Sequence, residues 1–177
     1  MLNGSFRIRI SMWTVALLTA VATLMPLANA TAAKKNAGPD LSSARPLTTE
    51  ELYRLYHGRS WIWRDGAGYF QVSKRQFHAF SGRGRGIGYG EGLWFLTDGG
   101  RLCFRAEWNG RDGKSKALTC FAHYTDGKKI YQRKMPDGDW YVFRNSPQRR
   151  SDEASKLRPG DYAKHGVARA KARLNKN

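Results

Sequence analysis

The pattern of hydrophobic and polar positions changes near residue 60 of this 177-residue chain. From there on, short runs of β-branched and aromatic residues alternate with Asp-Gly and Asn-Gly pairs, which accept the positive φ of tight hairpin turns. Short strands joined by tight turns favour a mainly β fold, a small antiparallel meander that closes into a lipocalin-like β-barrel. The runs place the strands near 60–64, 68–72, 76–80, 88–97, 101–108, 116–124, 129–135 and 139–144.

One short helix is predicted before the first strand. Thr48 and Glu51 have the spacing of a capping box, in which the Thr hydroxyl accepts a backbone N–H and the Glu side chain reaches back. Apolar side chains then follow on one stripe, and Gly58 offers a left-handed stop. These signals predict a helix near 49–57 that closes one end of the barrel.

Residues 1–30 have the layout of a secretory signal peptide. Arg7 and Arg9 precede an apolar stretch, and Ala28-Asn29-Ala30 matches an Ala-x-Ala cleavage site. An uncleaved anchor is the alternative, but threonines and a proline interrupt the stretch. The sequence therefore predicts a periplasmic or secreted protein.

Three further segments follow the signal. Residues 31–46 contain almost no large apolar side chains and are predicted to be a disordered spacer. Residues 47–146 form the expected β-barrel-like domain. Residues 147–177 are expected to be a flexible basic tail, which adheres to an anionic surface or only aids solubility.

The two cysteines, Cys103 and Cys120, are predicted to form a disulfide, because an exported protein meets an oxidising environment. If they face each other across an antiparallel hairpin, Glu107 lies opposite Lys116. The same register gathers the apolar side chains on one face, which can point inward.

Glycine occupies every second position from 82 to 92. In an extended segment the glycines would share one bare face, which would allow close approach by a bulky neighbour or a ligand. The favoured interpretation is instead a mobile loop over 81–87, followed by a strand that begins near Gly88. Arg83 and Arg85 then form a cationic loop tip.

The net charge of the chain limits the classes of partner that it is expected to bind. Its 31 Lys and Arg and 14 Asp and Glu leave +17, and two of these charges depart with the signal. The excess is +2 over residues 31–49, +7 over 50–146 and +6 over 147–177. A basic protein outside the cytoplasm is expected to meet an anionic envelope polymer or a membrane surface rather than nucleic acid.

The candidates for catalysis are few. The four histidines are far apart in sequence, no metal-binding or nucleotide-binding motif occurs, and most aspartates stand in turn signatures. His123 is two residues from Phe121 and so lies on the same, inward-facing side of the predicted strand, which favours a hydrogen-bonded core histidine. We therefore expect no catalytic residues, no metal and no cofactor. An envelope polysaccharide hydrolase, the less favoured alternative, would need Glu91 or His78 in a cleft beside a second acid.

Several motifs resemble a family of small exported proteins of unknown function from rhizobia and related alphaproteobacteria. The resemblance spans about 47–161 and implies a bacterial envelope location and a single β-rich domain, but it supplies no catalytic residues. The motifs are Tyr56 to Trp63, Asp65 to Phe70, Cys103 to Ala106, Cys120-Phe121, Ile130 to Arg133 and Trp140 to Arg144.

These observations predict a monomeric, non-enzymatic binding module that is associated with the envelope and binds acidic polysaccharide or lipopolysaccharide. A lipocalin-like carrier of a small apolar ligand is the first alternative. The candidate ligand-binding residues are basic side chains at predicted loop tips and in the tail: Arg83, Arg85, Lys128, Lys129, Arg149 and Arg150.

Overall fold

A computed structural model describes residues 38–176, so the predictions made for the signal peptide and for residues 31–37 lie outside the described residues. The described chain forms a ten-stranded antiparallel sheet, in which β2 to β9 follow one another in order and β10 pairs with β2. Its strands are β1 (Arg45–Pro46), β2 (Arg59–Trp63), β3 (Gly66–Phe70), β4 (Gln76–Ser81), β5 (Gly88–Thr97), β6 (Arg101–Gly110), β7 (Gly113–Thr125), β8 (Ile130–Lys134), β9 (Tyr141–Arg144) and β10 (Leu157–Pro159).

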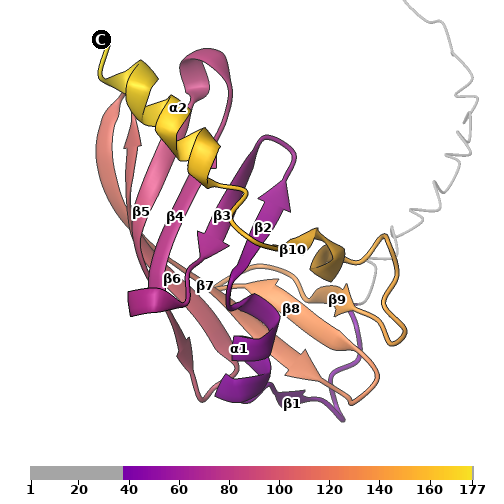
Figure 1. The fold of residues 1–177 in the computed structure, drawn as a ribbon. Coiled ribbons are helices and arrows are strands. Elements are labelled where there is room, and N and C mark those ends of the chain that lie inside the picture. Colours follow the sequence, from indigo (N-terminus) through magenta and orange to yellow (C-terminus); the bar gives the residue numbers. More distant parts are fainter. Residues whose placement is uncertain (1–37, 177) are drawn as a thin grey trace, which may run out of the picture. The chain divides into compact units, whose positions relative to one another are not determined.

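The predicted mainly β meander is confirmed, and all eight predicted runs contain a strand. The sheet curls into a half-barrel (Figure 1). The expected closure into a full barrel is incomplete, because the two end strands β9 and β10 do not pair with each other among the described residues. The short helix η3 (Glu153–Lys156) contacts both of them. Asp152 anchors this connection by accepting the backbone N–H groups of Asn145 and Arg149, each at 2.8 Å.

Helix α1 (Thr49–Tyr56) begins with the predicted capping box. The Thr48 hydroxyl accepts the N–H of Glu51 at 3.2 Å, and the Glu51 carboxylate accepts the N–H of Thr48 at 2.8 Å. After the helix, Gly58 adopts the predicted left-handed conformation with φ of +66°. Leu52 and Tyr56 are fully buried, and the Tyr56 ring packs edge-on against Phe70 of β3. The helix therefore fills part of the concave side of the sheet (Figure 1).

The core contains a buried polar network around His123. Its Nδ1 lies 3.1 Å from the Phe121 carbonyl oxygen, which can only accept, so Nδ1 carries the proton. Its Nε2 lies 2.7 Å from the Tyr56 hydroxyl, and the Gln132 amide donates to that hydroxyl at 2.9 Å. The prediction of a hydrogen-bonded core histidine is confirmed, and burial lowers the pKa of His123 to about 3.

The predicted register of the cysteine hairpin is confirmed, with Cys103 opposite Cys120 and Glu107 opposite Lys116. The two sulfurs lie at disulfide-bonding distance. The charge pairing differs in detail, because the Glu107 carboxylate lies 3.6 Å from the ammonium of Lys114. Both groups are well exposed, so the long lysine side chain can reach along the strand instead of directly across it.

The glycine run divides where the favoured interpretation placed the boundary. Strand β5 begins at Gly88, and the preceding loop contains the single turn η2 (Gly84–Gly86). Within β5, a Cβ at Gly90 would lie 2.8 Å from the Trp108 ring. Glycine is therefore needed there so that the indole can lie flat against the strand.

The structure corrects the expectation for the ends of the domain. Arg45 and Pro46, assigned to the spacer, form β1 and pair with β7. The flexible tail predicted over 147–177 is instead ordered as far as residue 176, because η3 and β10 join the sheet region and helix α2 (Lys164–Leu174) packs on β4 and β5. Figure 1 shows α2 lying across the outer, convex side of the sheet.

Small residues hold α2 against the sheet. Ala163, Gly166, Val167 and Ala170 are buried, and a Cβ at Gly166 would lie 2.0 Å from the Phe80 ring. Their apolar surface is too small to indicate a buried helix from periodicity alone, but the absence of a side chain at Gly166 lets the helix approach closely. Two polar contacts add to this packing: His78 Nε2 lies 2.9 Å from the Asp161 carboxylate, and the Lys171 ammonium pairs with Glu91 at 2.7 Å.

Replacing Gly166 by valine should destabilise the protein by about 1–3 kcal/mol, because the added carbons overlap the Phe80 ring and force α2 away from the sheet. Urea unfolding at neutral pH measures the change. Gly86→Ala is the matched control, since a Cβ at Gly86 would meet nothing within 4 Å. Equal unfolding midpoints for the Gly166→Val variant and the unmodified protein would show that α2 does not depend on this contact.

Candidate anion-binding site

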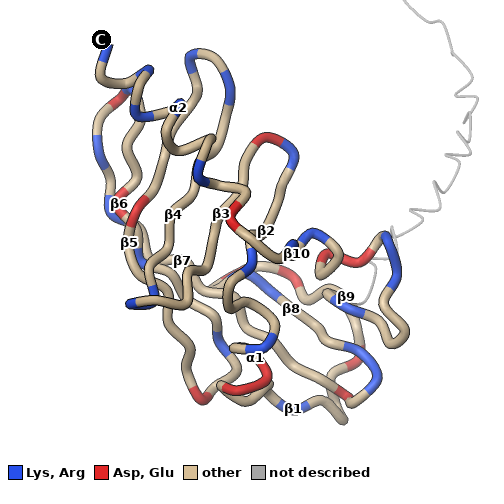
Figure 2. Tube along the Cα trace, viewed as in Figure 1, with Lys and Arg blue, Asp and Glu red and all other residues tan. Residues whose placement is uncertain are grey.

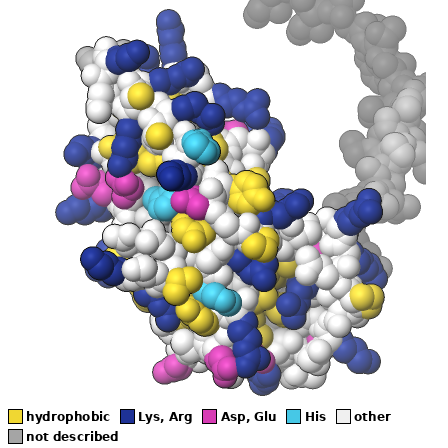
Figure 3. All heavy atoms as spheres, viewed as in Figure 1, with side chains coloured by type: hydrophobic (Ala, Val, Ile, Leu, Met, Phe, Trp, Pro, Cys, Tyr) yellow, Lys and Arg dark blue, Asp and Glu magenta, His cyan; other side chains and the backbone are white. Residues whose placement is uncertain are grey.

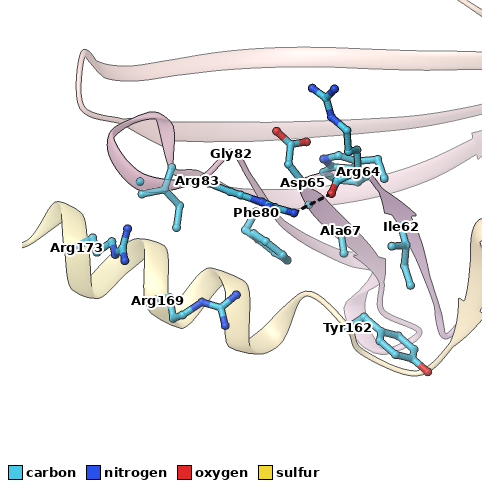
Figure 4. Close-up of a pocket in the computed structure, with 14 residues that line it drawn as sticks. Ile62, Arg64, Asp65, Ala67, Phe80, Gly82, Arg83, Tyr162, Arg169 and Arg173 are labelled. Carbon is cyan, nitrogen blue, oxygen red and sulfur yellow. Dashed lines mark hydrogen bonds between the residues drawn. The ribbon is translucent and has the colours of Figure 1, made fainter.

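Four arginines surround a cavity of about 540 Å³ between α2 and the convex side of the sheet. Arg64 lies in the turn between β2 and β3, Arg83 in the loop between β4 and β5, and Arg169 and Arg173 lie one helical turn apart on α2. Figure 4 shows Arg83, Arg169 and Arg173 beside the cavity, whereas the Arg64 guanidinium points away from α2. Asp65 is the single acidic residue in its lining.

Two of the arginines that line this cavity contact neighbouring residues. The Arg83 guanidinium donates to the Arg64 carbonyl oxygen at 3.4 Å, which ties the glycine loop to the β2–β3 turn (Figure 4). The guanidinium of Arg169 lies 6.0 Å from the centre of the Phe80 ring. Among the described residues, Arg64, Arg83 and Arg169 form no ion pair with a carboxylate. Their charges therefore remain available to a ligand.

A second cavity of about 350 Å³ adjoins the first and shares Gly84, Ile87 and Arg173 with it. Its lining contains no acidic residue. We call the two cavities together the basic groove. Figure 2 shows that α2 and the β4–β5 loop carry several of its positive charges, and Figure 3 shows cationic side chains gathered over the same part of the surface. Its basic residues are Arg64, Arg83, Arg85, Arg111, Arg169, Arg173 and Lys176.

The groove can bind anions by charge and by hydrogen-bond geometry. Each guanidinium presents a planar fork of donors that matches carboxylate and phosphate oxygens. All seven basic residues are exposed, so a polymer can reach them without rearrangement of the core. Phe80 and Tyr162 in the lining add apolar surface beside the charges.

The structure brings together only some of the residues proposed from the sequence. Arg83 and Arg85 lie in the groove. Lys128 and Lys129 lie in the β7–β8 turn, where their backbone N–H groups donate to Asp126, and Arg149 and Arg150 lie between β9 and η3. None of these four lines either cavity of the groove.

Sequence reasoning missed most of the groove. Arg64 and Arg111 stand in turns far apart along the chain, and Arg169, Arg173 and Lys176 were assigned to a flexible tail. The spacing of Arg169 and Arg173, four residues apart beside a row of small residues, is the signal that could have placed them on one exposed helix face.

The residues considered for hydrolysis have structural partners. His78 and Glu91 lie opposite each other on β4 and β5. The hydrogen bond of His78 with Asp161 and the ion pair of Glu91 with Lys171 attach the α2 region to the sheet. Asp161 also accepts the first N–H groups of the α2 region. Neither His78 nor Glu91 lines the basic groove.

Fold and site together define a β half-barrel that carries a helix and a basic groove on its convex side. The family described as "Protein of unknown function (DUF995)" matches residues 21–163, and the chain belongs to this family. The match includes every strand and ends one residue before α2. No curated protein and no solved structure matches the chain.

Among residues 38–176, no helix has the length and apolar character needed to cross a membrane. The same residues contain no group of three or more His, Cys, Asp or Glu side chains that could hold a metal ion.

Proposed function

We propose that this protein is a non-enzymatic binding module for anionic material of the bacterial envelope, and that the basic groove is its binding site. The observation that carries the proposal is the gathering of seven basic side chains around two adjoining cavities that contain one acidic residue. The ligand groups are carboxylates or phosphates, as found on acidic polysaccharide and lipopolysaccharide. The signal-like N-terminus and the disulfide support a periplasmic or secreted location.

Binding to immobilised alginate, an acidic polysaccharide, should be strong at low salt and should weaken steeply between about 50 and 200 mM salt. The Arg83→Ala, Arg169→Ala double variant should lose about a hundredfold or more in affinity at low salt, because it removes two charged hydrogen bonds that contribute about 1.5–3 kcal/mol each. Surface plasmon resonance measures both effects.

The matched control is the Lys128→Ala, Lys129→Ala double variant, which removes the same charge outside the groove. It should lose only the small, uniform effect of lower net charge. If both variants bind alike, the groove is not the site. Binding that does not change with salt would contradict an ionic interaction altogether.

A second candidate function, the carriage of an apolar ligand, is favoured by a cavity of about 200 Å³ on the concave side of the sheet. We call it the aromatic cavity, because seven of its nine lining residues are aromatic. Gly68 and Glu153 complete the lining. The aromatic residues are Trp61, Trp63, Phe70, Phe77, Phe104, Trp108 and Phe121.

A further inference from the structure

The basic groove and the aromatic cavity share one residue, Trp63, at the end of β2. Arg64 and Asp65 follow it in the turn to β3 and line the groove. Its indole N–H donates to the Ser81 hydroxyl at 3.3 Å, which holds the ring at the rim of the sheet. Trp63 therefore borders both the charged site and the apolar site.

Glycines keep the aromatic cavity open. A Cβ at Gly66 would lie 2.3 Å from the Trp63 indole nitrogen, and a Cβ at Gly68 would lie 2.9 Å from the Phe77 ring. With Gly90 beneath Trp108, three glycines thus let three aromatic rings lie flat on the sheet. Larger residues at these three positions would displace the aromatic rings that line the cavity.

The charged residues near the aromatic cavity differ between its two ends. Its single ionisable group is Glu153, which accepts the Trp61 indole N–H at 2.9 Å and pairs with the Lys156 ammonium at 2.6 Å. A carboxylate there disfavours an anionic group inside the cavity. On the other side of Trp63, the positive charges of Arg64 and Arg83 favour an anionic group.

We propose that the ligand is an anionic amphiphile, whose phosphate or carboxylate head binds in the basic groove and whose hydrocarbon chain passes Trp63 into the aromatic cavity. This inference rests on the proposed function and narrows its ligand to molecules with an apolar chain next to the charge. The hydrocarbon chain of the ligand exchanges contact with water for contact with aromatic rings, while the arginines bind the anionic head group.

The test compares inorganic phosphate with butyl, hexyl and octyl phosphate, each below its micelle-forming concentration, and with octyl glucoside, which has the chain but no charge. Calorimetry gives the affinities, and tryptophan fluorescence reports occupancy of the cavity, since three tryptophans line it. Affinity should rise about fourfold for each added methylene that becomes buried and then level off when the cavity is filled. Octyl phosphate should bind more tightly than both octyl glucoside and inorganic phosphate.

Two variants separate the parts of the site. Trp108→Ala should weaken the dependence on chain length and leave the affinity for inorganic phosphate unchanged, whereas Trp108→Phe should restore most of the dependence. Trp140→Ala is the matched control, because Trp140 packs against Tyr124 and does not line the cavity. Arg83→Ala, at an exposed loop position, should weaken inorganic phosphate and octyl phosphate by the same factor.

The outcomes distinguish this inference from the proposed function. Equal affinities for inorganic phosphate and octyl phosphate, with the groove variants still impaired, would overturn the amphiphile and leave the anion site standing. Equal affinities for octyl phosphate and octyl glucoside, with no effect of Arg83→Ala, would overturn the anion site and leave an apolar carrier.

Discussion

Acidification from pH 6.5 to pH 3 should destabilise the folded protein by on the order of 4 kcal/mol through His123 alone. In the folded state burial holds the pKa of His123 near 3, whereas the unfolded chain binds the proton near 6.5. Between these values the unfolded state binds more protons. The contribution of neutral His123 to the free energy of unfolding is therefore complete above pH 6.5 and is lost progressively as the pH falls towards 3.

The surroundings of His123 explain the size of this effect. Tyr56 stays neutral, because burial raises its pKa, and the Gln132 amide carries no charge, so no buried anion compensates an imidazolium. Glu51 adds a smaller contribution of the same sign at lower pH, since its hydrogen bond from Arg45 lowers its pKa to about 2.

Guanidinium unfolding at a series of pH values measures the slope, and His123→Gln is the informative variant. Glutamine is neutral throughout, so this variant should start less stable at pH 7 but lose less stability down to pH 4. If the variant and the unmodified protein show the same slope, the burial of neutral His123 is not the cause of acid sensitivity.

The parts of the fold that could be predicted are those that depend on local rules. Turn pairs located the hairpins, Thr48 and Glu51 located the helix start, and the pairing of Cys103 with Cys120 set a register that gathers apolar residues on one face. Each of these signals lies within a short stretch of chain and has one favourable geometry.

The C-terminal region could not be predicted because its stability comes from contacts with distant residues. Strand β10 pairs with β2 about a hundred residues earlier, and the α2 contact depends on Gly166 fitting against Phe80. A helix that packs through small residues has a weak apolar stripe, and its many cations resemble those of a solvated tail.

The candidate site was missed for the same reason. The groove combines a turn after β2, a loop after β4, a turn after β6 and a helix, and only the folded sheet brings them together. The basic residues of the C-terminal segment thus belong to a structured surface. The excess charge of that segment is the basis for proposing an anionic ligand, and the packing of α2 places Arg169 and Arg173 beside the groove.

Removing the disulfide should cost about 3 kcal/mol of stability and lower the melting temperature by about 10 °C. The bond links residues 17 apart, near the open end of the β6–β7 hairpin, and mainly restricts the unfolded chain. The Cys103→Ser, Cys120→Ser variant measured by urea unfolding tests the size of the effect, and the unmodified protein with and without reductant is the control. Alginate binding by the folded variant should persist, because neither cysteine lines the basic groove. A variant as stable as the oxidised protein would mean that the unfolded chain already keeps this hairpin closed, which would remove the entropic basis of the stabilisation.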